Sequence, residues 1–390
     1  MATAVNIFSV APARIGGVDM LVPLFAEISQ AFPSSAIEII FLETRIAHEV
    51  NIRPQLEKDV LWVSKRCTRL NWDDTQHGMA RYVVKVCRLL PLMARILISR
   101  KPILIHSRAN QTRVVDLLGR CARLKGGTVL GHPDMQTVFF GRSNELSRKI
   151  QSDINGWLAF GAGEGSVRPK SSDDLPVHIM GYTKLYPAWQ QHLKVLARDL
   201  RRRLFPEEQI ATTNRAQCPV TFAVFSGSVV ETVYSEDDLR FFFDEVFSVL
   251  SKEYPGSQVL VKCHPMDKSD ISKDAAALAQ GLKIHFVDDH PGAVAASSNC
   301  VIATHTSAII DSLGYGTPTI LHQKFSNEWM QRHPEKSSFL SLGVPYSHDS
   351  KTLEKAISIQ LSSHCILPDI RKVLRHRVDL SVFAKAAGGV

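Results

Sequence analysis

Short apolar runs rich in β-branched residues alternate along this chain with longer segments whose apolar positions recur every three or four residues. In the first half, the alternation predicts strands over 5–10, 37–43, 103–107, 128–134, 156–161 and 177–182. Helices are predicted over 20–32 and over 112–126, where Gly126 and Gly127 end the second one. Strands that alternate with helices in this way are typical of βαβ units, so we expect a parallel sheet covered by helices.

The second half repeats the same alternation. Its predicted strands are 220–227, 258–265, 283–289, 300–307 and 318–323. Its predicted helices are 238–254, 271–281, 291–299 and 308–316. Between the halves, a charged helix and the polar stretch ATTNRAQ predict a linker. We therefore expect an α/β protein with two Rossmann-like domains, the first over residues 1–186 and the second over 218–372. A linker over 187–217 joins them, and a tail over 373–390 follows.

The segment RYVVKVCRLLPLMARILISRK, residues 81–101, mixes aliphatic with basic residues. It predicts either a basic amphipathic helix that docks on an anionic bilayer or a core helix with snorkelling cations, broken in the middle by Pro91. No run of 18 apolar residues occurs, so no membrane span is expected, and the N-terminus predicts no secretory signal. The expected location is the cytoplasm, with a peripheral position at the inner face of the plasma membrane as the alternative.

The charge balance adds a preference for anionic partners. The 390 residues include 46 Lys and Arg against 38 Asp and Glu, a formal net charge of +8. RDLRRRLF, residues 198–205, raises the alternative of a nucleic-acid-binding protein. The dispersed basic residues, with no zinc-ligand spacing, aromatic RNA-binding run or helix-turn-helix signature, disfavour it. The seven cysteines lack CxxC spacing and are expected to be free thiols.

Candidate chemistry follows the strands of the second half, because ligands of open α/β sheets bind beyond the carboxyl ends of the strands. The residues at these positions are small, hydroxylic or basic: Ser226, Gly227, Ser228, Lys262, His264, Thr304, His305, Thr306 and Ser307. Backbone N–H groups at a helix start, hydroxyl donors and cations suit a phosphate or pyrophosphate. Pro265 lacks an N–H and ends its strand, whereas Thr306 and Ser307 either cap the following helix or bind phosphate oxygens.

Three segments together resemble a known superfamily. They are KCHP at 262–265, TSAIIDSLGYGTP at 306–318 and IMGYTKLYPAW at 179–189. The chain resembles GT-B glycosyltransferases that use cytidine nucleotides: the CDP-glycerol glycerophosphotransferases and the bacterial sialyl-, polysialyl- and Kdo-transferases. The resemblance implies a GT-B fold, with two Rossmann-like domains whose parallel sheets face an interdomain cleft. It also implies that the His-Pro pair and the hydroxyl pair hold the cytidine phosphate. Thr183 and Lys184 stand where those families usually have Pro-Arg.

The resemblance implies an enzyme that moves a sugar from a CMP-linked donor, of the Kdo or sialic acid type, to a capsule or lipopolysaccharide acceptor. The alternatives are a CDP-glycerol-type transferase and a UDP-sugar enzyme or epimerase. The expected partners are the nucleotide sugar and a glycan or lipid-linked glycan, with membrane contact as a further possibility and no nucleic acid. No cofactor is expected, and the lack of a clear DxD pair at a strand end disfavours a metal-dependent mechanism.

The first half is then expected to hold the acceptor, with Arg14, Gly16 and Gly17 in the loop after the first strand. The catalytic candidates are Glu231, Asp134 and His132. Glu231 is either a nucleophile, a general base or a solvated loop carboxylate, and Asp134 is either a general base or a helix cap.

Overall fold

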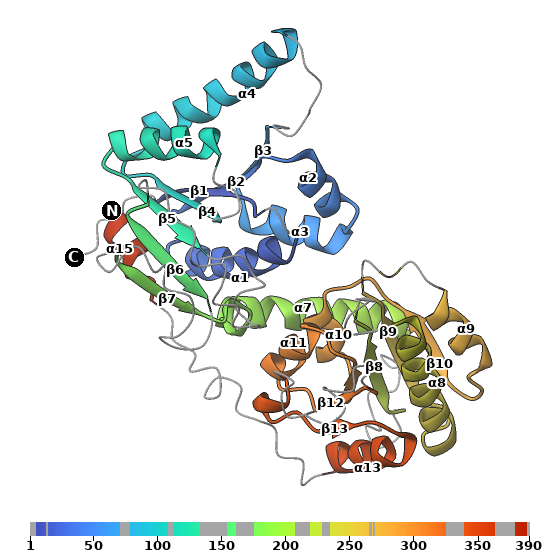
Figure 1. The fold of residues 1–390 in the computed structure, drawn as a ribbon. Helices are drawn as coiled ribbons and strands as arrows, with labels where there is room; N and C mark the ends of the chain where they lie inside the picture. The colour runs from blue at the N-terminus through green and yellow to red at the C-terminus, as the bar shows by residue number, and fades with distance from the viewer. Residues whose placement is uncertain are drawn as a thin grey trace. The chain divides into compact units, whose positions relative to one another are not determined.

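The structure, a computed structural model, contains two compact units. It describes residues 5–12, 15–70, 79–107, 112–132, 154–160, 175–206, 219–227, 235–264, 267, 270–324, 339–362 and 379–387. Unit 1 comprises residues 1–189 and 374–390, and unit 2 comprises residues 190–373. Each unit is built around its own sheet (Figure 1).

Unit 1 contains a parallel sheet of seven strands in the order β3-β2-β1-β4-β5-β6-β7. The strands are β1 (Asn6–Val10), β2 (Ala36–Phe41), β3 (Arg66–Arg69), β4 (Ile103–Ser107), β5 (Thr128–His132), β6 (Gly156–Phe160) and β7 (Val177–Gly181). The chain order reverses between β1 and β4, which are neighbours, and such a reversal is the usual ligand-binding position of a doubly wound sheet.

Helices cover both faces of this sheet. They are α1 (Ile15–Ala31), α2 (Thr44–Asn51), α3 (Pro54–Val63), α4 (Met79–Ile98), α5 (Arg113–Leu124) and α15 (Ser381–Ala386), with a 3₁₀ turn, η3 (Thr183–Leu185). In Figure 1, α4 and α5 lie on one face and α1 and α3 on the other. Residues of α4 and α5 share a buried cluster with Phe8 and Val10 of β1.

Residues 379–387 are part of unit 1 although they follow unit 2 in the chain. The N–H of Asp379 donates to the carbonyl oxygen of Ile179 in the edge strand β7 at 2.8 Å. The Asp379 carboxylate lies 3.4 Å from Nδ1 of His178. Val382 and Phe383 of α15 are buried, so this segment covers the edge of the sheet and adds to its core.

Unit 2 contains a parallel sheet of six strands in the order β10-β9-β8-β11-β12-β13. The strands are β8 (Thr221–Phe225), β9 (Gln258–Lys262), β10 (Lys283–Phe286), β11 (Cys300–Ala303), β12 (Thr319–His322) and β13 (Tyr346–Ser347). The chain order reverses between the neighbours β8 and β11, as it does between β1 and β4 in unit 1.

The helices of unit 2 are α8 (Glu236–Glu253), α9 (Ile271–Leu278), α10 (Pro291–Ala296), α11 (Ala308–Tyr315) and α13 (Ser350–Leu361), with η7 (Leu340–Leu342). Helix α7 (Pro187–Leu204) begins in unit 1 and continues through the first residues of unit 2. There Arg201 donates to the carbonyl oxygen of Ser297, which follows α10, at 2.6 Å. Gly292 in α10 allows a close approach, because a Cβ there would lie 2.7 Å from a methyl carbon of Leu193 in α7.

Two parallel sheets with helices on both faces confirm the predicted fold class, an α/β protein with two Rossmann-like domains. The prediction of a break at Pro91 is wrong, since α4 runs without interruption from Met79 to Ile98. Pro91 provides no N–H for the carbonyl group of Cys87, but both residues are exposed, and on the solvent side of a helix the loss of one such bond is tolerated. No helix in the described parts of the chain has the length and apolar character needed to cross a membrane.

Candidate functional site

The central strands β8 and β11 of unit 2 end side by side, and the residues that follow them are hydrogen-bonded to one another. Ser226 and Gly227 follow β8, and Thr304 follows β11. The N–H of Gly227 donates to Oγ1 of Thr304 at 2.6 Å, and the N–H of Thr304 donates to the carbonyl oxygen of Phe225 at 3.0 Å. Thr304 is fully buried. The two strand ends are thus tied together where the chain order reverses.

Gly227 has a steric role in this contact. A Cβ at position 227 would lie 3.0 Å from the carbonyl oxygen of His305 and 3.0 Å from Oγ1 of Thr304. Only a residue without a side chain fits there without moving the loop after β11. This glycine therefore permits the close approach of two backbone segments at the carboxyl edge of the sheet.

The loop after β9 joins the same edge through Ser226. The N–H of Ser226 donates to the carbonyl oxygen of Lys262 at 3.2 Å, and Oγ of Ser226 accepts the N–H of His264 at 3.0 Å. The N–H of Asp267 donates to the carbonyl oxygen of His264 at 2.8 Å, which closes a turn beyond the strand. Burial raises the pKa of the Cys263 thiol, which disfavours a thiolate nucleophile at this position. Ser226 thus holds residues 262–264 against the end of β8.

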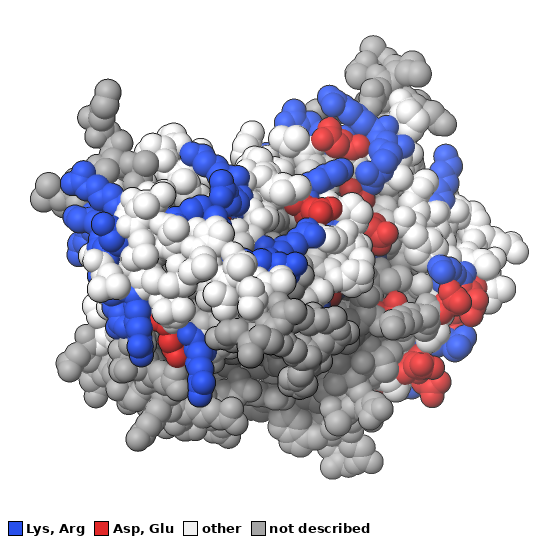
Figure 2. All heavy atoms as spheres, turned by 90° about the horizontal axis from the view of Figure 1, so that it is seen from above, with Lys and Arg blue, Asp and Glu red and all other residues white. Residues whose placement is uncertain are grey.

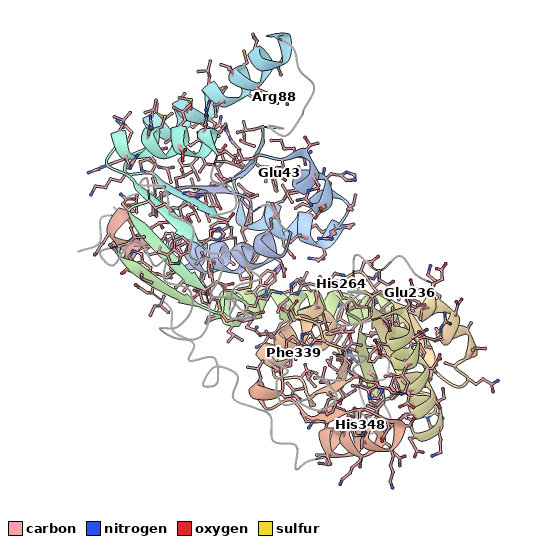
Figure 3. The ribbon with its side chains drawn as sticks, viewed as in Figure 1. Glu43, Arg88, Glu236, His264, Phe339 and His348 are labelled. Atoms are coloured by element: carbon pink, nitrogen blue, oxygen red, sulfur yellow. The ribbon has the colours of Figure 1, made fainter. Side chains whose placement is uncertain are left out.

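His305 contacts two residues that the sequence did not single out. Its N–H donates to Oε1 of Gln323, a fully buried residue just after β12, at 3.0 Å. Its ring packs edge-on against Phe339 with 4.7 Å between the ring centroids. Figure 3 labels Phe339 and His264 in unit 2. Burial lowers the pKa of His305, which favours the neutral imidazole at pH 7.

The position of Gln323 was available from the sequence, because it ends the predicted strand 318–323 and the strand-end rule applies to it. Phe339 carries no such signal. It lies beyond the residues on which any strand, helix or motif was predicted, and only the folded chain brings it to His305.

The start of α11 separates the roles of the two hydroxyl residues. Oγ1 of Thr306 accepts the N–H of Ala308 at 3.4 Å. Ser307 occupies the N-cap position but makes no capping bond with its side chain, and it is exposed to solvent. The sequence left two roles open for these residues, helix capping and phosphate binding. Thr306 fits the capping role, and the Ser307 side chain remains accessible at a helix N-terminus.

Several predicted site residues lie outside the described residues: Arg14, Asp134, Ser228, Glu231 and Pro265. Gly16 and Gly17 lie in the first turn of α1. His132 is the last residue of β5 and is 2% exposed, with its ring edge-on to Phe160 at 5.6 Å between centroids. The catalytic roles assigned to Glu231, Asp134 and His132 stay predictions.

Thr183 and Lys184 make specific contacts with α1 at the carboxyl edge of the unit 1 sheet. Nζ of Lys184 lies 2.6 Å from Oδ2 of Asp19, and Oγ1 of Thr183 donates to the carbonyl oxygen of Met20 at 2.7 Å. Lys184 is 6% exposed, so its charge is buried and compensated. The residues that depart from the Pro-Arg pattern thus fix the position of the turn before α7 against α1.

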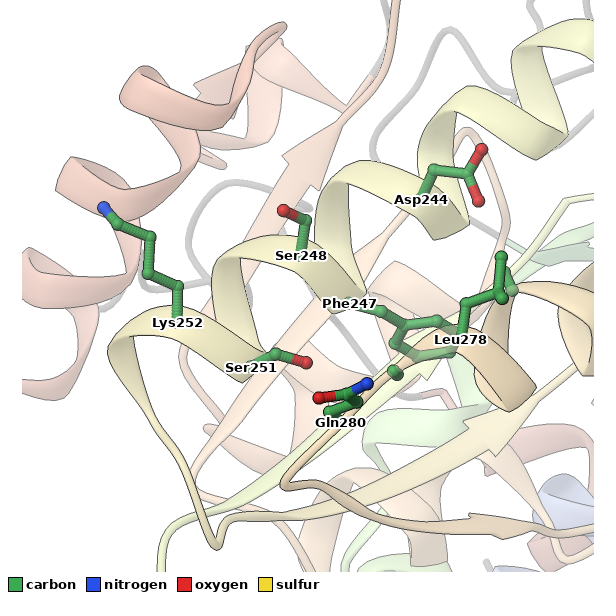
Figure 4. Close-up of a pocket in the computed structure, with 9 residues that line it drawn as sticks. Asp244, Phe247, Ser248, Ser251, Lys252, Leu278 and Gln280 are labelled. Atoms are coloured by element: carbon green, nitrogen blue, oxygen red, sulfur yellow. The ribbon is translucent and has the colours of Figure 1, made fainter.

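A surface pocket of about 570 Å³ lies between α8 and α9 of unit 2 (Figure 4). Phe247, Ser251 and Leu278 are among its lining residues. They belong to the later turns of the two helices, and in a βαβ unit these turns lie toward the amino ends of the strands. The pocket is therefore not at the edge where Ser226, Gly227 and Thr304 meet.

The chemistry of that edge is suited to an anion. The described residues include no group of three or more His, Cys, Asp or Glu side chains placed to hold a metal ion. The edge instead combines the hydroxyls of Thr306 and Ser307, the N-terminus of α11 and the basic side chains of Lys262 and His264. Such groups together provide the donors and the positive potential that a phosphate oxygen needs.

No family model matches this sequence, and no curated protein sequence matches it at a significant level. Among solved structures, MurG of Acinetobacter baumannii is similar over 98% of each chain, with 12% identity and a TM-score of 0.48. E. coli ADP-heptose LPS heptosyltransferase II is similar over 91% of this chain and 98% of its own, with 11% identity and a TM-score of 0.49. A putative UDP-N-acetylglucosamine 2-epimerase from Listeria monocytogenes is similar over 100% and 94%, with 10% identity and a TM-score of 0.48. Likeness at these values assigns neither an activity nor a substrate to this chain.

Proposed function

We propose that this protein is a GT-B glycosyltransferase whose nucleotide-sugar donor binds at the carboxyl edge of the unit 2 sheet. One observation carries the proposal: Ser226 and Gly227 are hydrogen-bonded to the loops after β9 and β11, at the point where the strand order reverses. Doubly wound sheets bind nucleotides at such points.

The chemistry of glycosyl transfer gives each group at this edge a role. When the bond between sugar and phosphate breaks, negative charge grows on the phosphate of the leaving nucleotide. The Ser307 hydroxyl and the amide groups at the start of α11 donate hydrogen bonds to that phosphate, Lys262 supplies positive charge, and the His264 imidazole adds a polar contact. Donors held in place by the Ser226 and Gly227 contacts need little reorganisation as the charge develops, which lowers the barrier.

The proposed donor is a cytidine nucleotide, of the CMP-Kdo or CMP-sialic acid type. Two segments resemble the cytidine-dependent transferases: KCHP at 262–265, whose His264 is bonded to Ser226, and TSAIIDSLGYGTP at 306–318, which begins two residues after Thr304, the partner of Gly227. A UDP-sugar or a CDP-glycerol donor would use the same phosphate contacts and differ in the base or in the transferred group. The donor class is therefore open to a direct binding test.

The proposed acceptor is a surface glycan, of capsule or lipopolysaccharide type, in free or lipid-linked form. Unit 1 would bind it through Arg14 and the glycine pair Gly16 and Gly17. The base that deprotonates the acceptor hydroxyl is sought among Glu231, Asp134 and His132. A metal ion has no part in this proposal, because cationic side chains and helix amides supply the positive potential.

A thermal-shift panel of CMP, CDP, UMP, UDP, ADP and GDP tests the donor site. We expect CMP to raise the unfolding midpoint most, and a nucleotide at a hundred times its Kd stabilises the folded state by about 2.7 kcal/mol. His264→Ala should abolish the CMP shift while leaving the backbone bond to Ser226 in place. His348→Ala, at a histidine whose side chain is 57% exposed, is the matched control and should keep the shift.

The outcomes of this panel separate the parts of the proposal. If UDP or ADP gives the largest shift and His264→Ala abolishes it, the transferase proposal stands and the cytidine donor is wrong. If no nucleotide shifts the midpoint, the donor site itself is wrong. For catalysis, we expect Glu231→Gln to abolish sugar transfer and to leave the CMP shift intact, and unchanged transfer would remove Glu231 from the candidates.

A further inference from the structure

Helix α4 carries an apolar stripe on the side that faces solvent. Val83, Cys87, Leu90, Ala94 and Ile98 are all exposed, and their spacing of four, three, four and four residues places them on one face of the helix. Val83 is 51%, Leu90 55% and Ile98 82% exposed. Side chains so open to water make no contribution to the core of unit 1.

The core-facing side of α4 is a different set of residues. Leu89, Leu92 and Ile96 are buried in the cluster over the sheet. Arg95 joins α4 to the sheet, with Nη2 2.6 Å from Oε1 of Glu38 in β2 and Nε 2.9 Å from Oε2. The helix is therefore fixed by one apolar side and presents a second apolar side outward.

The neighbouring helix α5 has an outward stripe of another composition. Arg113, Leu117, Arg120 and Leu124 are exposed at a spacing of four, three and four residues, and Leu124 is 79% exposed. Both helices pack on the same face of the sheet through one cluster, so both stripes are directed away from that sheet. We call these two stripes together the α4–α5 face.

The net positive charge of the chain is concentrated in the sequence segment that contains α4 and α5. Residues 79–125 include eleven Lys and Arg and one Asp, a formal charge of +10, whereas the whole chain has a formal charge of +8. The remaining residues together are thus slightly acidic. Figure 2 is viewed from the side on which α4 and α5 lie in Figure 1, and on its left lysine and arginine side chains border uncharged surface with sparse acidic side chains.

We propose that the α4–α5 face docks on an anionic lipid bilayer. The two helices would lie in the plane of the headgroups, with the aliphatic stripe of α4 in the boundary with the acyl chains and the arginines of α5 among the lipid phosphates. This proposal does not depend on the nucleotide site and goes beyond the proposed transferase activity.

Charge and composition favour a bilayer over the other occupants of such a face. A second copy of the chain would bring one segment with a charge of +10 against another, and this repulsion opposes association. A nucleic acid would neutralise the arginines but would leave the aliphatic stripe of α4 without an apolar partner, and the stripes carry no aromatic ring on which a base can stack. An anionic bilayer satisfies both the cations and the aliphatic side chains.

Flotation of the full chain with vesicles tests the proposal. The probes are vesicles of phosphatidylcholine alone and vesicles containing about one third phosphatidylglycerol. We expect binding to the second kind only, and a weaker interaction when salt is raised from about 0.05 to 0.5 M. Leu90→Glu and Ile98→Glu should each lower the partition coefficient at least about tenfold, and Arg113→Gln/Arg120→Gln should lower it about 25-fold, since each cation contributes about fivefold.

Controls matched in exposure come from the other unit. Leu278→Glu changes a leucine that is 81% exposed, against 82% for Ile98, and Arg202→Gln changes an arginine whose side chain is 66% exposed. Both control variants should bind vesicles as the unchanged protein does. Circular dichroism and the unfolding midpoint of every variant identify any that misfold, and the conclusion is then drawn from the other stripe variants.

Two results would overturn the proposal. The first is the absence of binding to phosphatidylglycerol vesicles at low salt by the folded protein. The second is a pattern in which the arginine variant weakens vesicle binding, Leu90→Glu and Ile98→Glu leave it unchanged, and the protein binds RNA or DNA more tightly than vesicles. That pattern would assign the face to a nucleic acid.

Discussion

His322, the last residue of β12, is fully buried in a largely apolar site. Its Nδ1 lies 2.9 Å from Oγ of Ser347, and its ring packs against Phe241 and Phe242 at about 6 Å between centroids. Burial lowers the pKa of His322 to about 4, because the site does not hydrate the imidazolium ion. Oε2 of Glu245 lies 3.8 Å from Nε2 of the ring.

The sign of the pH effect follows from the ordinary histidine pKa of about 6.5 in the unfolded chain. As the pH falls from 6.5 toward 4, the unfolded chain binds a proton at His322 that the folded protein does not bind. The free energy of unfolding therefore has its full value above pH 6.5 and decreases as the pH falls through this window. For a folded-state pKa of about 4, linkage gives a loss of about 2 kcal/mol between pH 7.5 and 5.0.

His322→Asn isolates this contribution, because asparagine keeps a polar group near Ser347 and does not titrate. Its smaller volume destabilises the protein to the same extent at both pH values, so only the pH dependence is compared. In urea denaturation followed by circular dichroism, the unchanged protein should lose about 2 kcal/mol more than the variant between pH 7.5 and 5.0. His348→Asn, at an exposed histidine, should behave as the unchanged protein does.

Equal losses for the unchanged protein and His322→Asn would refute this reasoning. They would mean that the ring ionises in the folded state at its ordinary pKa, with the Glu245 carboxylate compensating the charge. An NMR titration of the His322 ring provides a direct second measurement, since its midpoint should lie near pH 4.

Three further substitutions test contacts that lie within one unit or the other. Glu27→Ala removes the carboxylate that accepts the N–H of Ala188 in the first turn of α7 at 3.1 Å, and urea denaturation should show a loss of about 1 kcal/mol, with a smaller loss for Glu27→Gln. Glu38→Ala leaves Arg95 without its bidentate partner and should cost about 2–3 kcal/mol, whereas a double-mutant cycle with Arg95→Ala should show a total below the sum of the single losses. Gly227→Ala should cost about 1–2 kcal/mol and reduce the CMP-induced thermal shift, and an unchanged shift would show that the loop contact is not needed for binding.

The strongly periodic segments were predictable because their apolar positions are buried by the sheet. Strand β4 occupies the predicted residues 103–107, and all five of its residues are buried. Strand β3, with the sequence RCTR, was not predicted, because its side chains are partly exposed at the sheet edge and show no apolar alternation. The continuity of α4 through Pro91 depends on solvent exposure, which periodicity does not reveal.

The candidate site was predictable as a set of strand ends but not as a set of contacts. The sequence places Ser226, Lys262 and Thr304 near the ends of separate strands, and the strand-end rule brings all of them to one edge. Ser226 contacts the loop after β9 because β8 lies between β9 and β11. Gln323 accepts a hydrogen bond from His305 because β12 lies beside β11. The order of strands in a sheet is set by packing over long sequence separations.

The return of residues 379–387 to the edge of β7 has a consequence for folding during synthesis. The ribosome makes residues 190–373 before it makes the segment that pairs with Ile179 and buries Phe383. All residues of unit 2 are thus made before unit 1 receives its last segment, although the seven strands of the unit 1 sheet are made first. Until the last segment emerges, β7 remains an open strand edge, and the nascent chain is exposed to mispairing there.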